Sequence, residues 1–323
     1  MKTGIIRLAV KITLTAIGLV VSACNPQIPT QQIVASQSAA TETKPATTIP
    51  QDAQMSSSTT MESAPSQALD ATASISIREA TAMTTQMPVK ITILYDNMKY
   101  DLALTTAWGY SALIEYKGET TLFDTGGDGA TLLKNMQILG TDPTKIERVV
   151  LSHNHSDHTG GVMALLELGI RPTIYMLPSF PDDFKQRFSQ YTTIIEVVSG
   201  QSITTGLMTT GEMPRNVPEQ ALVIETDSGV VVITGCAHPG IVEIVEQVRE
   251  VFDDPVLLVM GGFHLRSKSR SEIELILRDF RRLGVEQVAP SHCTGDTAIA
   301  MFAREYGENF IQAGAGKVIQ LGE

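Results

Sequence analysis

Residues 148–161 read RVVLSHNHSDHTGG, so three histidines and an aspartate directly follow a short apolar segment. Where a strand ends in a turn, alternate side chains point the same way. We therefore expect His153 and His155 to bind one cation, and Asp157 and His158 to turn toward a second. Imidazole and carboxylate ligands together suit Zn²⁺, Fe or Mn²⁺ better than Ca²⁺. A solvated loop that happens to be rich in histidine does not explain the apolar segment before the run or the glycine pair after it.

The remaining histidines lie later in the chain, in motifs that contain glycine. His238 belongs to TGCAHPG, His264 to GGFHL and His292 to PSHCTG. Each of the six histidines follows the end of a predicted strand or sits in a glycine-rich turn. This placement predicts that imidazoles distant in the chain meet around a shared ion.

These motifs resemble the metallo-β-lactamase superfamily, whose signature His-x-His-x-Asp-His is matched in full at 153–158. The resemblance covers 89–323 and implies an α/β fold, a four-layer αββα sandwich with two mixed sheets inside and helices outside. It also implies that Asp124, in LFDTG, orients the metal loop and that His292 completes the second metal position. The three later motifs together resemble the group related to dihydropterin-aminobenzene phosphate synthase, whose members are usually labelled metal-dependent hydrolases.

The chain departs from the superfamily pattern because it has no histidine between 159 and 237. The related group implies a histidine near 175–178, where Tyr, Met, Leu and Pro stand here. Either His238 completes the first metal position, with Cys236 or a water as the bridge, or that position lacks a ligand and binds metal weakly. Cys236 stands where other members carry a bridging aspartate, and a buried structural thiol is the alternative. Glu219 stands where the related group shows a pair of aspartates, so its role is left open.

Other residues near the motifs have two interpretations each. His264 either holds an anionic substrate or shuttles a proton, or it forms hydrogen bonds behind the ligands. Cys236 and Cys293 either stay free or pair as a disulfide if the protein is extracytoplasmic. Trp108 and Tyr110 either wall the cleft or belong to the core.

The pattern of apolar residues predicts strands that first form hairpins and later alternate with helices, which favours two sheets with helices outside. The predicted strands are 90–95, 111–116, 120–123, 147–151, 173–177, 194–198, 220–226, 230–234, 256–260, 286–290 and 317–321. The predicted helices are 129–139, 161–168, 181–189, 239–252, 271–283 and 295–306.

The amino-terminal segment, 1–24, has the pattern of a lipoprotein signal peptide. Three basic residues, Lys2, Arg7 and Lys11, precede an apolar run at 12–21, which is too short to span a membrane but suits a secretory signal. The run ends in VSAC, which resembles the bacterial lipobox with Cys24 as the lipidated residue. An ordinary signal with a chance cysteine is the alternative. The first interpretation predicts an extracytoplasmic protein of the bacterial cell envelope, anchored to a membrane by lipid.

Residues 25–88 contain 20 Ser or Thr and neither glycine nor an aromatic residue. Such a stretch cannot bury enough apolar surface to offset the entropy of ordering the chain. We therefore expect a disordered Ser/Thr/Ala/Pro/Gln-rich linker that leads to a catalytic domain at 89–323.

The overall charge excludes one class of function. With a formal net charge of −11, the chain does not suit non-specific binding of nucleic acid. A short basic segment at 266–270 is the local exception, and a solvated loop accounts for it.

The leading hypothesis is a hydrolase in which one or two divalent cations, Zn first and Fe or Mn next, activate water against a small ester, lactone or phosphoester. The expected metal ligands are His153, His155, Asp157, His158, His238 and His292. Asp157 and His264 are the expected catalytic residues, with Asp157 taking a proton from the water. The alternative is a membrane-anchored lipoprotein that binds metal or a small ligand without turnover.

Overall fold

The computed structural model describes residues 88–322. The predictions for the signal peptide, Cys24 and the linker fall on residues outside this range, apart from Pro88, and they stay predictions. Among the described residues, no helix combines the length and the apolar character that a membrane crossing requires.

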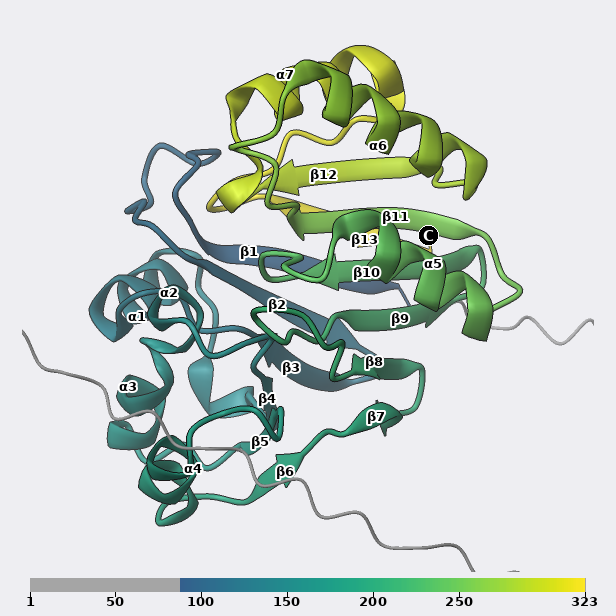
Figure 1. Cartoon of the computed structure of the whole chain (residues 1–323). Helices are drawn as coiled ribbons and strands as arrows, with labels where there is room; N and C mark the ends of the chain where they lie inside the picture. Colours follow the sequence, from purple (N-terminus) through teal and green to yellow (C-terminus); the bar gives the residue numbers. More distant parts are fainter. Residues whose placement is uncertain (1–87, 323) are drawn as a thin grey trace, which may run out of the picture. The chain divides into compact units, whose positions relative to one another are not determined.

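Figure 1 labels the elements of the described part. The strands are β1 (Val89–Asp96), β2 (Tyr110–Tyr116), β3 (Glu119–Phe123), β4 (Arg148–Val150), β5 (Thr173–Met176), β6 (Ile194–Glu196), β7 (Ser199–Thr204), β8 (Leu207–Gly211), β9 (Leu222–Thr226), β10 (Gly229–Thr234), β11 (Val256–Gly262), β12 (Gln287–Ser291) and β13 (Val318–Leu321). The α-helices are α1 (Gly129–Ile138), α2 (Ser156–Thr159), α3 (Val162–Glu167), α4 (Asp182–Ser189), α5 (Ile241–Val251), α6 (Arg270–Arg282) and α7 (Asp296–Tyr306).

The strands form two mixed sheets, as predicted. The seven-stranded sheet has the order β13-β1-β2-β3-β4-β5-β6, and the six-stranded sheet has the order β12-β11-β10-β9-β8-β7. In the first sheet β3 to β6 run parallel, and in the second β10 to β12 do. Figure 1 shows α5, α6 and α7 over the six-stranded sheet and α1 to α4 beside the seven-stranded one. The predicted α/β fold is confirmed.

Strand β10 shows how the sequence builds the layers, since all six of its residues are buried. Val231 and Ile233 pack into the core that the two sheets share. Val230 and Val232 point the opposite way, into the core beneath α5, α6 and α7. Side chains along a strand alternate between its faces, so a continuous apolar run is what a strand covered on both sides requires.

The prediction missed two strands and one short helix. Strands β7 and β8 lie at 199–211, where the sequence is mostly polar and contains three glycines. Strand β7 is the edge of its sheet and is largely exposed, so backbone pairing holds it and apolar periodicity does not mark it. The turn expected after His155 contains the single helical turn α2, which carries Asp157 and His158.

Candidate metal centre

The polar residues of the candidate site lie where parallel strands end. Asp124 directly follows β3, and His153 comes three residues after β4 ends, in the seven-stranded sheet. In the six-stranded sheet, the register pairs Thr234 of β10 with Gly261 of β11, and Gly262 of β11 with Ser291 of β12. The loops that carry Cys236, His264 and His292 therefore leave that sheet side by side. Carboxyl ends of parallel strands are the usual position for a ligand site in an α/β sheet.

The backbone is strained at this edge. Among the described residues, five that are not glycine have positive φ, and four of them lie at the site: Asp124 (55°), Ala237 (59°), His264 (54°) and His292 (49°). Positive φ is unfavourable for residues with a Cβ and concentrates where the surrounding structure holds a functional side chain in place.

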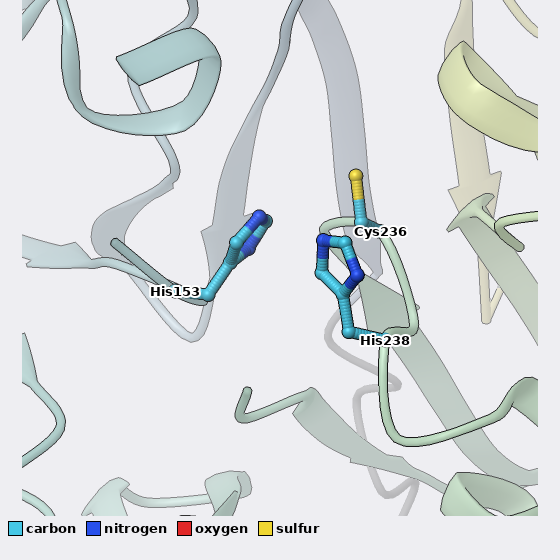
Figure 2. A group of neighbouring side chains, drawn as sticks. All are labelled: His153, Cys236 and His238. Atoms are coloured by element: carbon cyan, nitrogen blue, oxygen red, sulfur yellow. The ribbon is translucent and has the colours of Figure 1, made fainter. Parts of the chain in front are cut away.

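A first group of donor atoms comes from His153, His155, Cys236 and His238. The Nε2 atom of His153 lies 3.0 Å from Nδ1 of His155, and the His238 ring centroid is 4.8 Å from that of His153 and 4.9 Å from that of His155. One donor atom each of His153, Cys236 and His238 lie within 4.8 Å of one another. Figure 2 shows His153 approaching Cys236 and His238 from the opposite side.

A second group of donor atoms comes from Asp157, His158, Cys236 and His292. The Nε2 atom of His158 lies 3.3 Å from Sγ of Cys236 and 3.5 Å from Oδ2 of Asp157. The same carboxylate oxygen lies 3.4 Å from Nε2 of His292. One donor atom each of His158, Cys236 and His292 again lie within 4.8 Å of one another.

Cys236 is the residue that the two groups share, and its side chain is buried. Its position matches the bridging alternative considered from the sequence. Bonds of about 2.0–2.1 Å to nitrogen and about 2.3 Å to sulfur are typical of zinc, so donors at these separations can reach a common ion after small adjustments.

Two buried imidazole nitrogens that lack hydrogen-bond partners also indicate that a cation fits this site. Nε2 of His238 and Nε2 of His292 are buried and have no hydrogen-bond partner of acceptable geometry among the described residues. Buried polar atoms are rarely left in this state, and an ion that accepts their lone pairs resolves it. The residues present therefore fit one or two divalent cations.

Hydrogen bonds behind the donor atoms turn the rings toward the centre. Oδ2 of Asp124 lies 2.7 Å from Nδ1 of His158 and accepts from the Ser152 hydroxyl at 2.7 Å. That hydroxyl lies 2.9 Å from Nδ1 of His153. Because Ser152 donates to Asp124, it accepts the Nδ1 proton of His153, which leaves Nε2 of both rings free as a ligand atom. Asp124 therefore holds His158 directly and His153 through Ser152, and its role in orienting a bound metal stays a prediction.

Asn97 orients His292 in the same manner. Its Oδ1 atom lies 2.9 Å from Nδ1 of His292, and its amide nitrogen donates to the His292 carbonyl oxygen at 3.2 Å. Asn97 follows β1 and is 195 residues from its partner, so the sequence carries no signal for it.

Glu219 holds the loop that carries Cys236 and His238. Its buried carboxylate accepts backbone N–H groups from Gly235 at 3.1 Å, Cys236 at 2.8 Å, Ala237 at 2.9 Å and His238 at 2.8 Å. Four donors to one carboxylate fix the path of this loop. The sequence left the role of Glu219 open because nothing local marks a side chain that binds a backbone 16 to 19 residues away.

Two other predictions on site residues have outcomes in the structure. Met176 and Leu177, near which the related group implies a histidine, are fully buried in the core, and the third imidazole near His153 and His155 is that of His238. Cys236 and Cys293 are free thiols, so the considered disulfide is absent; Sγ of Cys293 is directed at the Cys236 carbonyl oxygen, 3.6 Å away.

His264 lies at the border of two cavities. Its ring centroid is 4.4 Å from that of His238, and the residue is exposed. A cavity of about 630 Å³ lies on one side of it, toward α5 and α6, and a cavity of about 270 Å³ lies on the other, toward Trp108. His264 is therefore placed to contact a bound molecule beside the donor groups.

The protonation of the imidazoles differs between the two groups. Burial lowers the pKa of His153 well below its usual value, lowers that of His155, and brings that of His238 to about 4. Burial also opposes the charged form of His158, but the carboxylates of Asp124 and Asp157 outweigh it and raise its pKa to about 10. The imidazoles of the first group are thus neutral at pH 7, whereas a cation at the second group displaces a proton from His158. A hydrogen bond with Cys293 and burial raise the pKa of the Cys236 thiol, so a cation that binds Cys236 displaces its proton as well.

We expect His238 to lower the stability of the metal-free protein as the pH falls from about 6.5 to about 4. The unfolded chain protonates His238 near its ordinary pKa of 6.5 and the folded chain only near 4, so at this residue the unfolded state binds more protons in that window. The Asp96 carboxyl acts in the opposite direction, because burial raises its pKa to about 6 and its protonation favours the folded state. The raised pKa of His158 affects stability at alkaline pH. The stabilisation by protonated His158 is fully present below pH 6.5 and is lost as the pH rises through about 10. Urea unfolding in the presence of a chelator, at pH 5, 7 and 9, measures this profile. The loss of stability from pH 7 to pH 5 should be smaller in His238→Gln than in the wild type, and an equal loss in both proteins would contradict the prediction.

Comparisons with known proteins agree on the fold. A family model described as "Metallo-beta-lactamase superfamily" matches residues 109–292, more than half of the chain. A solved structure, Tm1679, described as a metal-dependent hydrolase of the beta-lactamase superfamily, is 30% identical with a TM-score of 0.64, and the match covers 73% of this chain and 100% of that one. The metallo-beta-lactamase fold protein YhfI from Bacillus subtilis, at 18% identity and a TM-score of 0.55, covers 73% of this chain and 100% of its own, and supports the fold alone.

A curated relative from Methanocaldococcus jannaschii is 28% identical over 283 residues, which cover 71% of this chain and 95% of the relative. It is named 7,8-dihydropterin-6-methyl-4-(beta-D-ribofuranosyl)-aminobenzene-5'-phosphate synthase. This name describes a different type of enzyme from the hydrolase that Tm1679 is described as.

Proposed function

This chain belongs to the metallo-beta-lactamase superfamily, and from that premise we propose that it is a metal-dependent hydrolase acting on an ester, a lactone or a phosphoester. The observation that carries the proposal is the pair of donor groups that share Cys236. A solvated or purely structural loop gives no reason for two buried ring nitrogens without hydrogen-bond partners at the same edge.

The proposed ligands are His153, His155 and His238 on one side of Cys236, and Asp157, His158 and His292 on the other. Zinc suits the mixture of imidazole, thiolate and carboxylate best, with iron or manganese as alternatives. A divalent cation bound there would supply a Lewis acid and would lower the pKa of a water molecule toward about 7.

The chain's own residues then position the reactants. Asp157 keeps about one fifth of its side chain exposed, 19%, and turns one oxygen toward His158 and His292. Burial alone would raise the pKa of Asp157, but these imidazoles hold it well below its usual range. We propose that Asp157 accepts a proton from water that enters the site once a bound cation has displaced the His158 proton. His264, at the border of the two cavities, is proposed to contact the substrate. Asp124, Ser152 and Asn97 hold the rings in the orientation in which Nε2 faces the centre.

The test is metal analysis of the full chain, purified without a chelator, followed by assays on esters, lactones, phosphodiesters and a β-lactam. We expect about one to two equivalents of a transition metal and turnover of at least one class. His155→Ala is expected to reduce turnover by about 100-fold. Asn154→Ala, which changes an exposed residue of the same loop, serves as the control.

The outcomes separate this proposal from a protein that binds metal or a small ligand without turnover. Metal present at stoichiometric levels with no turnover of any substrate class would favour the binding protein. Only trace metal in the purified chain would exclude the metal-dependent hydrolase and a metal-binding protein, and would leave a protein that binds a small ligand. The synthase activity named for the relative is not transferred to this chain, because no observation on its residues calls for a condensation.

We also propose that the protein is exported and anchored by lipid at Cys24 to a membrane of the bacterial envelope. The basic residues, the apolar run and the VSAC sequence at 21–24 support this. Labelled fatty acid should be incorporated into the wild-type chain and not into Cys24→Ser, which should also leave the membrane fraction. Equal labelling of the variant would refute the anchor.

A further inference from the structure

We propose that the 270 Å³ cavity beside the second donor group binds an anionic group of the substrate, phosphate or carboxylate, and that Arg266 is the cation that holds it. This inference rests on the proposed function, and it narrows the substrate to one that carries a negative charge away from the bond that is cleaved.

The cavity adjoins the donor residues directly. Trp108, His264, Arg266, Ser267 and Cys293 line it. The Trp108 ring lies against the ring of His292, with 4.9 Å between centroids, and Cys293 is the next residue after His292. A molecule in this cavity therefore lies next to the proposed metal ligands.

Arg266 presents its charge to this cavity. Its guanidinium carbon lies 5.5 Å from the centre of the Trp108 ring, and among residues 88–322 it has no ion pair and no hydrogen-bonded partner. The guanidinium is planar and its N–H groups match two oxygens of a phosphate or carboxylate, while stacking on an aromatic ring leaves its donor edge free. The hydroxyl of Ser267 is a second donor on the same wall.

The charge of the two cavities decides which one takes the anion. The larger cavity is lined by the acidic residues Glu243, Glu246, Glu272 and Asp279, against the two cations Arg215 and Lys268. The smaller cavity has no carboxylate in its lining. Its one group that can become an anion is the buried Cys293 thiol, whose pKa is held well below its usual value by a hydrogen bond with Cys236, and beside it stands His264, whose pKa is raised. On a chain with a net charge of −11, an anion is repelled by most of the surface and favoured here.

An arginine without an ion pair is not by itself evidence of a binding site. The chain contains a second such arginine that can serve as a control for Arg266. Arg278 of α6 is also exposed and has no carboxylate partner in the described part, but it lines neither cavity. Arg278→Gln therefore changes the net charge as Arg266→Gln does while leaving the cavity intact.

The first experiment needs no turnover. Trp108 is the only tryptophan in the chain, so its fluorescence reports on this cavity. Inorganic phosphate and benzoate are titrated separately into the zinc-loaded full chain, and benzamide serves as the uncharged control ligand. We expect a saturable change with at least one anion and none with benzamide. The dissociation constant should rise about 10-fold in Arg266→Gln and stay unchanged in Arg278→Gln.

Equal binding of the anions by Arg266→Gln and the wild type would overturn the proposal, because the bound zinc alone would then account for the binding. Saturable binding of benzamide would overturn it as well. Since this result does not depend on catalysis, failure of the hydrolase proposal is recognised separately, by the absence of turnover.

The second experiment uses turnover. An uncharged ester and the same ester bearing a carboxylate remote from the scissile bond are compared in four proteins: the wild type, Arg266→Gln, Arg266→Lys and Arg278→Gln. Arg266→Gln should raise KM about 10-fold for the charged ester only, and Arg266→Lys should restore part of the loss. An equal effect on both esters would show that Arg266 acts on the site as a whole and would contradict an anion subsite.

Discussion

Cys236→Ser is expected to lower the affinity for both cations and to reduce turnover by at least about 100-fold. Cys236 is the single side chain present in both donor groups, with its Sγ atom 3.3 Å from Nε2 of His158. A serine hydroxyl is shorter, binds zinc more weakly than a thiolate and stays protonated at neutral pH. Zinc content by mass spectrometry, and kcat/KM on the best substrate, measure the two effects.

Cys293→Ser is the matched control, because Cys293 is a second buried free thiol in contact with the Cys236 carbonyl oxygen. One donor atom of Cys293 lies within 4.8 Å of donor atoms of Cys236 and His264, but Cys293 is not one of the proposed ligands. Cys293→Ser should therefore keep both metal equivalents. If Cys236→Ser retained its full zinc content and activity, a water rather than the thiol would occupy the bridging position.

Glu219→Gln is expected to reduce the free energy of unfolding of the metal-free protein by about 2–4 kcal/mol. The Glu219 carboxylate accepts four backbone N–H groups of the loop 235–238, with both oxygens in use. An amide of the same shape keeps one acceptor oxygen but turns an NH₂ group toward buried donors, which leaves them unsatisfied. Urea unfolding in the presence of a chelator gives the change in stability.

Because this loop carries Cys236 and His238, Glu219→Gln should also lower zinc affinity by about 10–100-fold. Glu225→Gln, an exposed glutamate of β9, makes the same chemical change where no such bonds exist, and should alter stability by less than about 0.5 kcal/mol. Loss of stability without loss of zinc affinity would limit Glu219 to a structural role.

Much of the fold was readable from the sequence. Apolar runs such as VVVIT in β10 predict strands that are covered on both faces, and the two-sheet arrangement that they imply is confirmed. Strands β7 and β8 were not predicted. The edge strand β7 is polar and is held by backbone pairing with β8, and such pairing leaves little trace in the sequence.

The residues of the site also fall into a part that the sequence predicted and a part that only the structure revealed. The sequence determined the cluster at 153–158, because residues so close in the chain remain close in space whatever the fold does, and the family resemblance added Asp124 and His292. Only the tertiary structure decided that His238 stands beside His153 and His155, that Cys236 lies between the two donor groups, and that Asn97 and Glu219 hold them. These partners come from strands whose separation along the chain reaches 195 residues, and their meeting depends on sheet order and register, which no local pattern of residues encodes.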